Sequence, residues 1–260
     1  ISDGNIVQSG QLVVIFGKRG LENMNLIILD KDGTMVDSLT PFYHAVVTIF
    51  RHYGLEPPTL DDYRDNITPD FMRFYWDRGI PLYVTSRELN RLRMELCGEE
   101  GASVELLPGA KELVNRCREL GFKIFLATAD TYEAASGQLE KLGIKELVSG
   151  WARGGISRRD DILDILAFAD GLYDDSEPWN VWYIDDTASG IADAKSIPLE
   201  GIHTIGFTGG FNSPRKFDEL PKDRAPDHIV NSLFAIPSII DAYVALRQYP
   251  ATNHSQWTIN

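Results

Sequence analysis

One apolar run that ends in two aspartates constrains this chain more than any other feature. Residues 25–29 read Asn-Leu-Ile-Ile-Leu, and Asp-Lys-Asp-Gly-Thr follows directly at residues 30–34. The run lacks the apolar–polar alternation of a half-exposed strand, so it predicts a buried strand of a parallel sheet. Asp30 and Asp32 then fall at the carboxyl edge of the sheet, where open α/β folds place their ligand sites.

The two carboxylates suit a hard cation. Residues two apart on an extended chain share a face, so Asp30 and Asp32 are expected to point into one cleft. Two like charges repel there unless a cation lies between them or one takes a proton. Mg²⁺ is the simplest such cation. The alternative is an acidic turn in which Gly33 supplies a tight bend, but the five-residue pattern after a strand favours a functional site.

Bulk composition excludes several classes of function. The chain has 260 residues and 43% hydrophobic residues, which is typical of a globular protein with a sizeable core. Its formal net charge is -13, from 38 acidic and 25 basic residues. Such a chain repels nucleic acid and anionic membranes, so neither is expected as a partner. No apolar run is long enough to span a bilayer.

Cysteine usage and the first residues bear on location. The two cysteines, Cys97 and Cys117, lack metal-ligand spacing and are expected to be buried thiols in a reducing compartment. No signal peptide is visible in residues 1–4. We therefore expect a cytoplasmic protein, although an organelle address stays open because the chain begins at Ile1 and not at Met.

The pattern along the chain predicts a core with a helical insertion. Residues 1–22 are expected to form an N-terminal extension with an edge strand or hairpin, and residues 248–260 a polar tail. Any protein partner is expected to use one of these two segments. Apolar residues recur at helical spacing through residues 41–105, which predicts an all-helical cap. Residues 23–40 and 106–247 make up the remaining core.

The core residues alternate between strand and helix patterns. Strands are expected at 122–127, 181–184, 202–207 and 228–230, and helices at 108–120, 133–142, 162–168, 189–195 and 237–247. This alternation predicts an α/β fold with a Rossmann-like parallel sheet and helices on both faces. Three strands end in polar residues, namely Asp30, Thr128 and the pair Asp185–Asp186. In a parallel sheet those ends converge on one edge.

These residue types suit phosphoryl transfer. Asp30 can attack phosphorus and form an aspartyl-phosphate, while Asp32 can protonate the leaving alcohol and then activate water. The Thr128 hydroxyl can hold a phosphoryl oxygen, and Asp185 and Asp186 add carboxylates for Mg²⁺.

Asp-Lys-Asp-Gly-Thr, with the apolar run before it and Val36-Asp37-Ser38 after it, resembles the first motif of the haloacid dehalogenase-like hydrolases, in particular their phosphoglycolate phosphatase-like members. The resemblance covers residues 24–246. It implies that Asp30 is the nucleophile, Asp32 the acid/base and Thr128 the second motif, and that residues 41–105 are a C1-type cap. The implied ligands of Mg²⁺ are Asp30, Asp32, Asp185 and Asp186, and the implied phosphate-binding residues are Gly33, Thr128 and Ala129.

The chain departs from the family pattern at three places. A common form of the fourth motif would put an acid at Gly190. Ala129-Asp130 stands where many relatives carry Asn. The lysine of the third motif is absent from residues 154–161. Arg158 or Arg159 is predicted to replace it catalytically, because guanidinium binds phosphate and carboxylate well. Arg153 is a weaker candidate, and the alternative for each arginine is a solvated residue at a helix start.

These observations predict a Mg²⁺-dependent phosphatase that acts on a small phosphorylated metabolite. Asp32 argues against a dehalogenase, because a leaving halide needs no proton. The absence of lysine between Lys31 and Lys111 argues against a phosphonate hydrolase that uses a Schiff base. Two alternatives stay open, a phosphomutase of the same fold and a weakly active or inactive subunit of a larger assembly. The cap is predicted to close over Asp30, so that changes at Arg73 or Trp76 alter substrate preference. For Trp76 the alternative, packing among the cap helices, is favoured.

Overall fold

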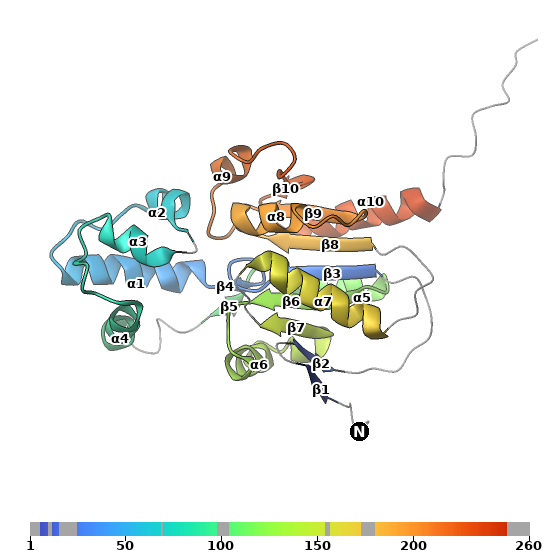
Figure 1. The fold of residues 1–260 in the computed structure, drawn as a ribbon, viewed down its shortest axis with the longest axis horizontal. Helices are drawn as coiled ribbons and strands as arrows, with labels where there is room; N and C mark the ends of the chain where they lie inside the picture. Colours follow the sequence, from blue (N-terminus) through green and yellow to red (C-terminus); the bar gives the residue numbers. More distant parts are fainter. Residues whose placement is uncertain are drawn as a thin grey trace, which may run out of the picture.

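The computed structural model describes residues 6–9, 12–15, 25–68, 70–97, 104–153, 157–172 and 180–248. Their central feature is an eight-stranded sheet of order β1-β2-β7-β6-β3-β8-β9-β10 (Figure 1). The six strands from β7 to β10 run parallel, and β1 and β2 form an antiparallel hairpin on β7 at one edge. The strands are β1 Ile6–Ser9, β2 Leu12–Ile15, β3 Asn25–Asp30, β6 Lys123–Thr128, β7 Gly150–Arg153, β8 Asn180–Asp185, β9 Ile202–Phe207 and β10 His228–Val230.

The apolar run of β3 explains why it lies in the middle of the sheet. Ile27 and Leu29 pack into the core on one face, and Leu26 and Ile28 pack into the core on the other. Helices α5 Ala110–Glu119, α6 Tyr132–Lys141 and α10 Ile236–Gln248 cover the first face, and α7 Arg158–Leu172, α8 Ala188–Lys195 and α9 Pro214–Asp218 cover the second. The predicted fold class, a parallel sheet with helices on both faces, is confirmed.

A helical insertion leaves the core directly after the first motif. Strands β4 Val36–Asp37 and β5 Glu105–Leu106 pair antiparallel where the chain leaves and re-enters the core. Between them lie the helices that we call the cap: α1 Leu39–His52, α2 Leu60–Asn66, α3 Phe71–Trp76 and α4 Ser86–Cys97. The cap has a hydrophobic cluster of its own. It lies at the end of the sheet to which the parallel strands point (Figure 1).

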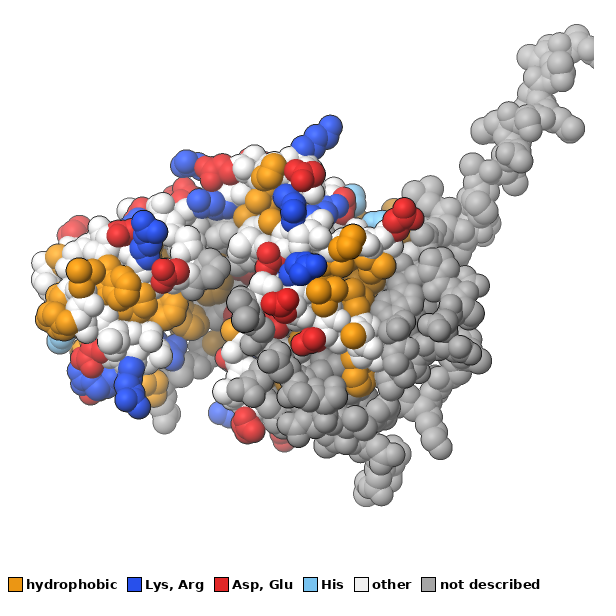
Figure 2. Space-filling view, viewed as in Figure 1, with side chains coloured by type: hydrophobic (Ala, Val, Ile, Leu, Met, Phe, Trp, Pro, Cys, Tyr) orange, Lys and Arg blue, Asp and Glu red, His pale blue; other side chains and the backbone are white. Residues whose placement is uncertain are grey.

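The surface of the cap carries apolar side chains. Figure 2 shows a patch of them on the cap, and it also shows apolar side chains next to acidic and basic ones over the core on the same face. The loop between α3 and α4 contributes Leu82 and Tyr83, which are each 79% exposed. Among the described residues, no helix combines the length and apolar character needed to cross a membrane.

Several elements differ from the sequence-based expectation. β7 and α9 were not predicted, because each is too short for its own periodicity to be recognised. The helix expected at 162–168 extends over Arg158–Leu172. In α4, Leu89 and Leu92 are buried, whereas Leu96 in the last turn is 40% exposed. Residues 1–5, 10–11 and 16–22 of the predicted N-terminal extension and residues 249–260 of the tail lie outside the described residues.

Candidate active site

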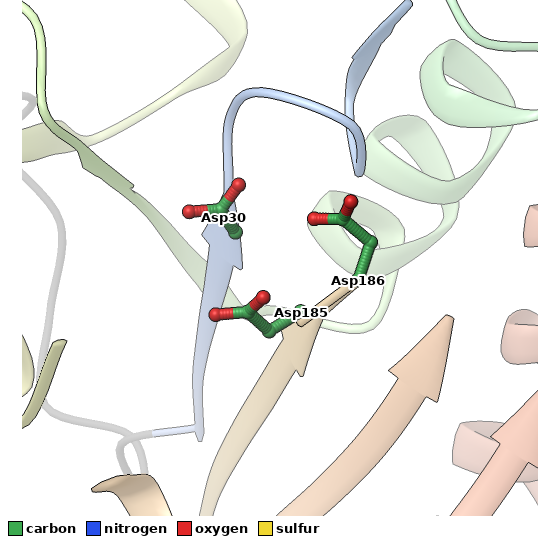
Figure 3. Close-up of side chains that lie close together, drawn as sticks. All are labelled: Asp30, Asp185 and Asp186. Carbon is green, nitrogen blue, oxygen red and sulfur yellow. The ribbon is translucent and has the colours of Figure 1, made fainter. Parts of the chain in front are cut away.

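Three carboxylates meet at the carboxyl edge of the sheet. In the parallel register of β3 and β8, Leu29 lies opposite Ile184, so the next residues, Asp30 and Asp185, end side by side. Asp186 follows Asp185 directly. One carboxylate oxygen from each of these three aspartates lies within 4.8 Å of the others. Figure 3 shows the three side chains around a common space at the ends of the two strands.

The three carboxylates are buried close together, which makes their ionised forms costly in free energy. Asp30 is 2% exposed, and Asp185 and Asp186 are fully buried. Burial raises the pKa of Asp30 well above its usual value, although the Arg158 guanidinium opposes the shift. Burial and the neighbouring Asp185 raise the pKa of Asp186 to about 8. Three hard oxygen donors that repel one another in a buried site form the donor set that Mg²⁺ prefers, so these residues fit the ion.

The raised pKa of Asp186 predicts how stability depends on pH. A carboxyl whose folded-state pKa lies above its unfolded value costs stability as pH rises between the two values. In chelator, the free energy of unfolding should therefore fall between about pH 4 and pH 8. Asp186→Asn should flatten this fall, whereas Asp218→Asn on the exposed surface should not. Denaturant unfolding at a series of pH values measures both, and parallel pH profiles for wild type and Asp186→Asn would contradict the expectation.

Two glycines and two donors fix the carboxylate of Asp186. The Thr34 hydroxyl donates to its Oδ1 at 3.1 Å and the Phe211 amide donates to its Oδ2. A Cβ at Gly33 would lie 2.2 Å from Oδ2, and one at Gly210 would lie 2.1 Å from it. Gly33 also has a φ of +86°, which provides the bend after β3. Its amide donates to the Val36 carbonyl at 2.9 Å within this turn.

Asp185 lies against Gly190, the position at which a common family form has another acid. Its Oδ1 accepts hydrogen bonds from the Thr187 amide and hydroxyl, both at 2.7 Å, and its Oδ2 accepts one from the Tyr183 hydroxyl. A Cβ at Gly190 would lie 1.9 Å from Asp185 Oδ2. The glycine that departs from the family pattern is therefore the residue that leaves room for Asp185.

An arginine contacts the first aspartate of the motif. Arg158, at the start of α7, places Nη2 2.6 Å from Asp30 Oδ1. Its Nη1 lies 3.0 Å from Oδ2 of the buried Asp161 one turn later, which orients the guanidinium. Arg159 is exposed, and the side chain of Arg153 lies outside the described residues. Of the predicted arginines whose side chains are described, Arg158 is the one that the fold brings to Asp30.

This geometry separates the two adjacent arginines by function. Arg158→Ala removes the cation beside Asp30 and should lower kcat on the order of 10²-fold, by analogy with the loss of one donor to a developing negative charge. Arg159→Ala is the matched control on the exposed side of the same helix turn and should change kcat by less than about threefold. Steady-state assays of both variants measure this, and equal losses would contradict the assignment.

The second motif lies beside the first. Ala127 on β6 lies opposite Asp30, so Thr128 follows one residue further along the neighbouring strand. Thr128 is fully buried, and its hydroxyl accepts a hydrogen bond from the Asp130 amide at 3.1 Å. Ala129 is exposed at the strand end. The predicted phosphate-binding residues thus lie at the same sheet edge as the carboxylates.

Asp32 has a different environment from the other three acids. Its side chain is 31% exposed, and its Oδ1 lies 2.9 Å from Lys31 Nζ. The close carboxylate group comprises Asp30, Asp185 and Asp186, without Asp32. Lys31 was not singled out by the sequence analysis. A lysine between two motif aspartates was the available signal, but its burial depends on the fold.

The cap contacts the loop that holds Asp186. Arg64 of α2 donates to the carbonyls of Gly210 at 3.0 Å, Thr208 at 2.5 Å and Asn212 at 3.0 Å. Phe42 of α1 packs edge-on against Phe211, with ring centroids 6.1 Å apart. Since the Phe211 amide binds Asp186, these contacts place the cap beside the carboxylate group.

Other cap residues surround this contact. The Arg93 guanidinium of α4 lies over the Phe42 ring, 5.1 Å from its centroid. Two other cap residues were predicted to influence substrate preference. Arg73 is 75% exposed and pairs with Asp77, and the Trp76 indole donates to the Val84 carbonyl inside the cap.

Comparison with known proteins decides the family. Residues 24–196 match the family model of the haloacid dehalogenase-like hydrolases. The chain belongs to this family. It is 24% identical over 191 residues to a phosphoglycolate phosphatase of Synechococcus elongatus, a match that covers 73% of this chain and 86% of that protein. It is 29% identical over 120 residues to YhcW of Bacillus subtilis, described as a putative phosphatase. That match covers 45% of this chain and only about half, 54%, of YhcW.

Solved structures of haloacid dehalogenase-like proteins share the fold. ATU0790 of Agrobacterium tumefaciens, a conserved protein of this type with unknown function, aligns with a TM-score of 0.65 at 21% identity over 85% of this chain and 100% of that chain. A protein from Thermotoga maritima, whose structure is described as that of a putative β-phosphoglucomutase, aligns with a TM-score of 0.60 at 19% identity. This match covers 84% of this chain and 99% of that chain. These likenesses establish the fold alone.

Proposed function

We propose that the chain is a Mg²⁺-dependent phosphatase that hydrolyses a small phosphorylated metabolite through an aspartyl-phosphate intermediate. One observation carries the proposal. Asp30 lies between a buried acidic pair and the Arg158 guanidinium, at the sheet edge where the first two family motifs meet. Membership of the hydrolase family and the phosphatase names of both relatives support it.

The residues divide the reaction into two displacements. A carboxylate oxygen of Asp30 attacks phosphorus, the ester P–O bond breaks, and the leaving alcohol takes a proton from Asp32. Water then attacks phosphorus, its proton passes to Asp32, and inorganic phosphate leaves as the bond to Asp30 breaks. Arg158 and the Thr128 hydroxyl hold phosphoryl oxygens during both steps.

The three buried carboxylates are the residues through which Mg²⁺ enters the proposal. Asp30, Asp185 and Asp186 are the residues that would hold Mg²⁺. The bound ion would supply the positive charge that lets a phosphate dianion approach three carboxylates.

The missing motif lysine and the glycine at position 190 are the two departures that speak for an inactive subunit. The local geometry offers a replacement group for each of them. Arg158 supplies a cation beside Asp30 although the motif lysine is absent. Asp185 occupies the space beside Gly190 although no acid stands at that position. For a phosphomutase, the solved structure with that description is 19% identical and speaks for the fold alone, so hydrolysis is the function proposed.

A panel of phosphorylated metabolites tests the proposal. The purified protein should release inorganic phosphate from at least one phosphomonoester in the presence of Mg²⁺. 2-Phosphoglycolate belongs in the panel because one relative carries that name. Rearrangement of a sugar phosphate without phosphate release would favour the mutase. Absence of any product from the whole panel would favour the inactive subunit.

A further inference from the structure

We infer that Lys31 is a positioning residue that holds the Asp32 carboxylate for proton transfer to the leaving group. The inference rests on the proposed function, because it assigns the support of the acid/base in that reaction. Lys31 stands between the two aspartates of the first motif. Neither the family match nor the relatives assign it a role.

Lys31 is buried and its ammonium group is fully engaged. The residue has 0% exposure. Its Nζ lies 2.9 Å from Asp32 Oδ1, 3.0 Å from Asp130 Oδ2 and 2.5 Å from Gln138 Oε1. An ammonium group has three N–H donors, and three acceptors surround it here. The charge is therefore directed to these partners and away from solvent.

Such burial is unusual for lysine. Lysine ordinarily extends its stem along the protein and keeps its ammonium group in water. Burying the charge is costly unless acids and hydrogen bonds compensate for it. The two acids that do so, Asp32 and Asp130, have side chains that are 31% and 37% exposed. The lysine lies inside the protein, while the carboxylates it holds face outward.

The contacts join Asp32 to neighbouring elements of the core. Asp130 follows β6, and Gln138 belongs to α6. The backbone of Lys31 is fixed as well, because its amide donates to the Ala127 carbonyl at 3.0 Å and its carbonyl accepts from Met35 and Val36. Asp130, a departure from the family pattern after Thr128, is explained as a partner of this lysine.

The Asp32 carboxylate depends on Lys31 for its orientation. In the described part of the chain, no other side chain or amide forms a hydrogen bond or ion pair with that carboxylate. A partly exposed carboxylate with no such partner would sample several rotamers, and proton transfer requires hydrogen-bond contact with the leaving oxygen. Lys31 fixes one oxygen and leaves the other available to exchange the proton.

A purely structural tie between β3 and β6 would give a different result from a positioning role. Loss of a structural tie should lower activity toward every phosphomonoester alike. If Lys31 positions the acid, the fall in activity on its loss should depend on the leaving group of the substrate, because an alkoxide needs a proton to leave and para-nitrophenolate does not. The ratio of kcat/KM for an alkyl phosphate to kcat/KM for para-nitrophenyl phosphate therefore separates the two roles.

The experiment compares Lys31→Met with wild type on both substrates in saturating Mg²⁺. For the alkyl phosphate, kcat/KM should fall on the order of 10²-fold, the usual contribution of a positioned acid. For para-nitrophenyl phosphate it should fall less than about tenfold. Lys145→Met removes a surface lysine that pairs with Glu140 and serves as the matched control, with both values unchanged.

A double-mutant cycle with Asp32→Asn gives a second readout. If Lys31 acts through Asp32, the double variant should lose no more alkyl phosphate activity than Asp32→Asn alone, within about threefold. If Lys31→Met fails to fold, Asp130→Asn removes one outer partner and should bias the two substrates in the same direction, by a smaller factor.

The outcomes separate the inference from the proposed function. Equal losses on both substrates, or losses that multiply in the double variant, would overturn the positioning role and leave a structural tie. Wild-type activity in Asp32→Asn would instead contradict the proposed mechanism, whatever Lys31→Met does.

Discussion

Replacing Asp30 by asparagine is expected to abolish phosphate release while the protein stays folded. A carboxamide cannot attack phosphorus as a carboxylate does, so the first displacement has no nucleophile. Turnover should fall by at least on the order of 10⁴-fold, as with other covalent catalysts that lose their nucleophile. Phosphate release and a denaturant unfolding curve measure the two halves of this expectation.

The fold should tolerate this change for an electrostatic reason. Asp30 is buried with Asp185 and Asp186 close by, and its pKa is raised, so a neutral side chain of the same shape relieves repulsion. Asp218→Asn is the control for a general effect of removing one negative charge, since Asp218 is exposed. Near-native turnover in Asp30→Asn would show that another residue attacks phosphorus.

Removal of the metal is the second change with a large expected effect. Activity should vanish in excess chelator and return with added Mg²⁺, because three buried carboxylates repel a phosphate dianion. Asp186→Ala removes one of the proposed ligands. Its affinity for Mg²⁺ should fall by about 100-fold or more, since even residues behind the ligands contribute up to that factor.

Metal binding and folding can be measured separately in this variant. Calorimetric titration with Mg²⁺ should show weaker binding to Asp186→Ala. Its unfolding midpoint in chelator should change less, because the loss of one buried acid offsets part of the cost of leaving the Thr34 hydroxyl and the Phe211 amide without their acceptor. Asp218→Ala controls for the charge change. Full activity of the wild-type protein in excess chelator would contradict the metal-dependent proposal.

The sheet edge that carries the candidate active site could be predicted, because buried parallel strands have a distinctive sequence pattern. The uninterrupted apolar residues before Asp30 and before Asp185 indicated buried strands, and the order of such strands brings their carboxyl ends together. The helical insertion was also predictable, since a long segment of helical periodicity without strands cannot extend the sheet.

Other features depend on contacts that no local pattern contains. Arg158 and Arg159 are adjacent and chemically identical, and only the direction of α7 decides which one contacts Asp30. Gly190 resembled a missing ligand until the position of the Asp185 carboxylate became known. Lys31 drew no prediction from its local pattern, because its partners Asp130 and Gln138 lie about a hundred residues away in the chain.

The cap was predictable as a helical unit but not in the direction of its side chains. Arg73 pairs with Asp77, and the Trp76 indole donates to the Val84 carbonyl, in agreement with the packing alternative for Trp76. The residues that contact the core from the cap include Phe42 and Arg64, whose partners lie in the loop after β9. Such long-range pairings follow from tertiary packing and not from helical periodicity.

The most direct test of the account is to find the phosphoryl group on Asp30. The protein is mixed with a substrate from the panel in the presence of Mg²⁺, quenched in acid during turnover, digested and analysed by peptide mass spectrometry. The account predicts a phosphoryl group on Asp30 in the peptide that contains residues 25–31, and none in the same peptide from Asp30→Asn. Turnover of that substrate with the phosphoryl group on another residue, or on no residue, would contradict the account.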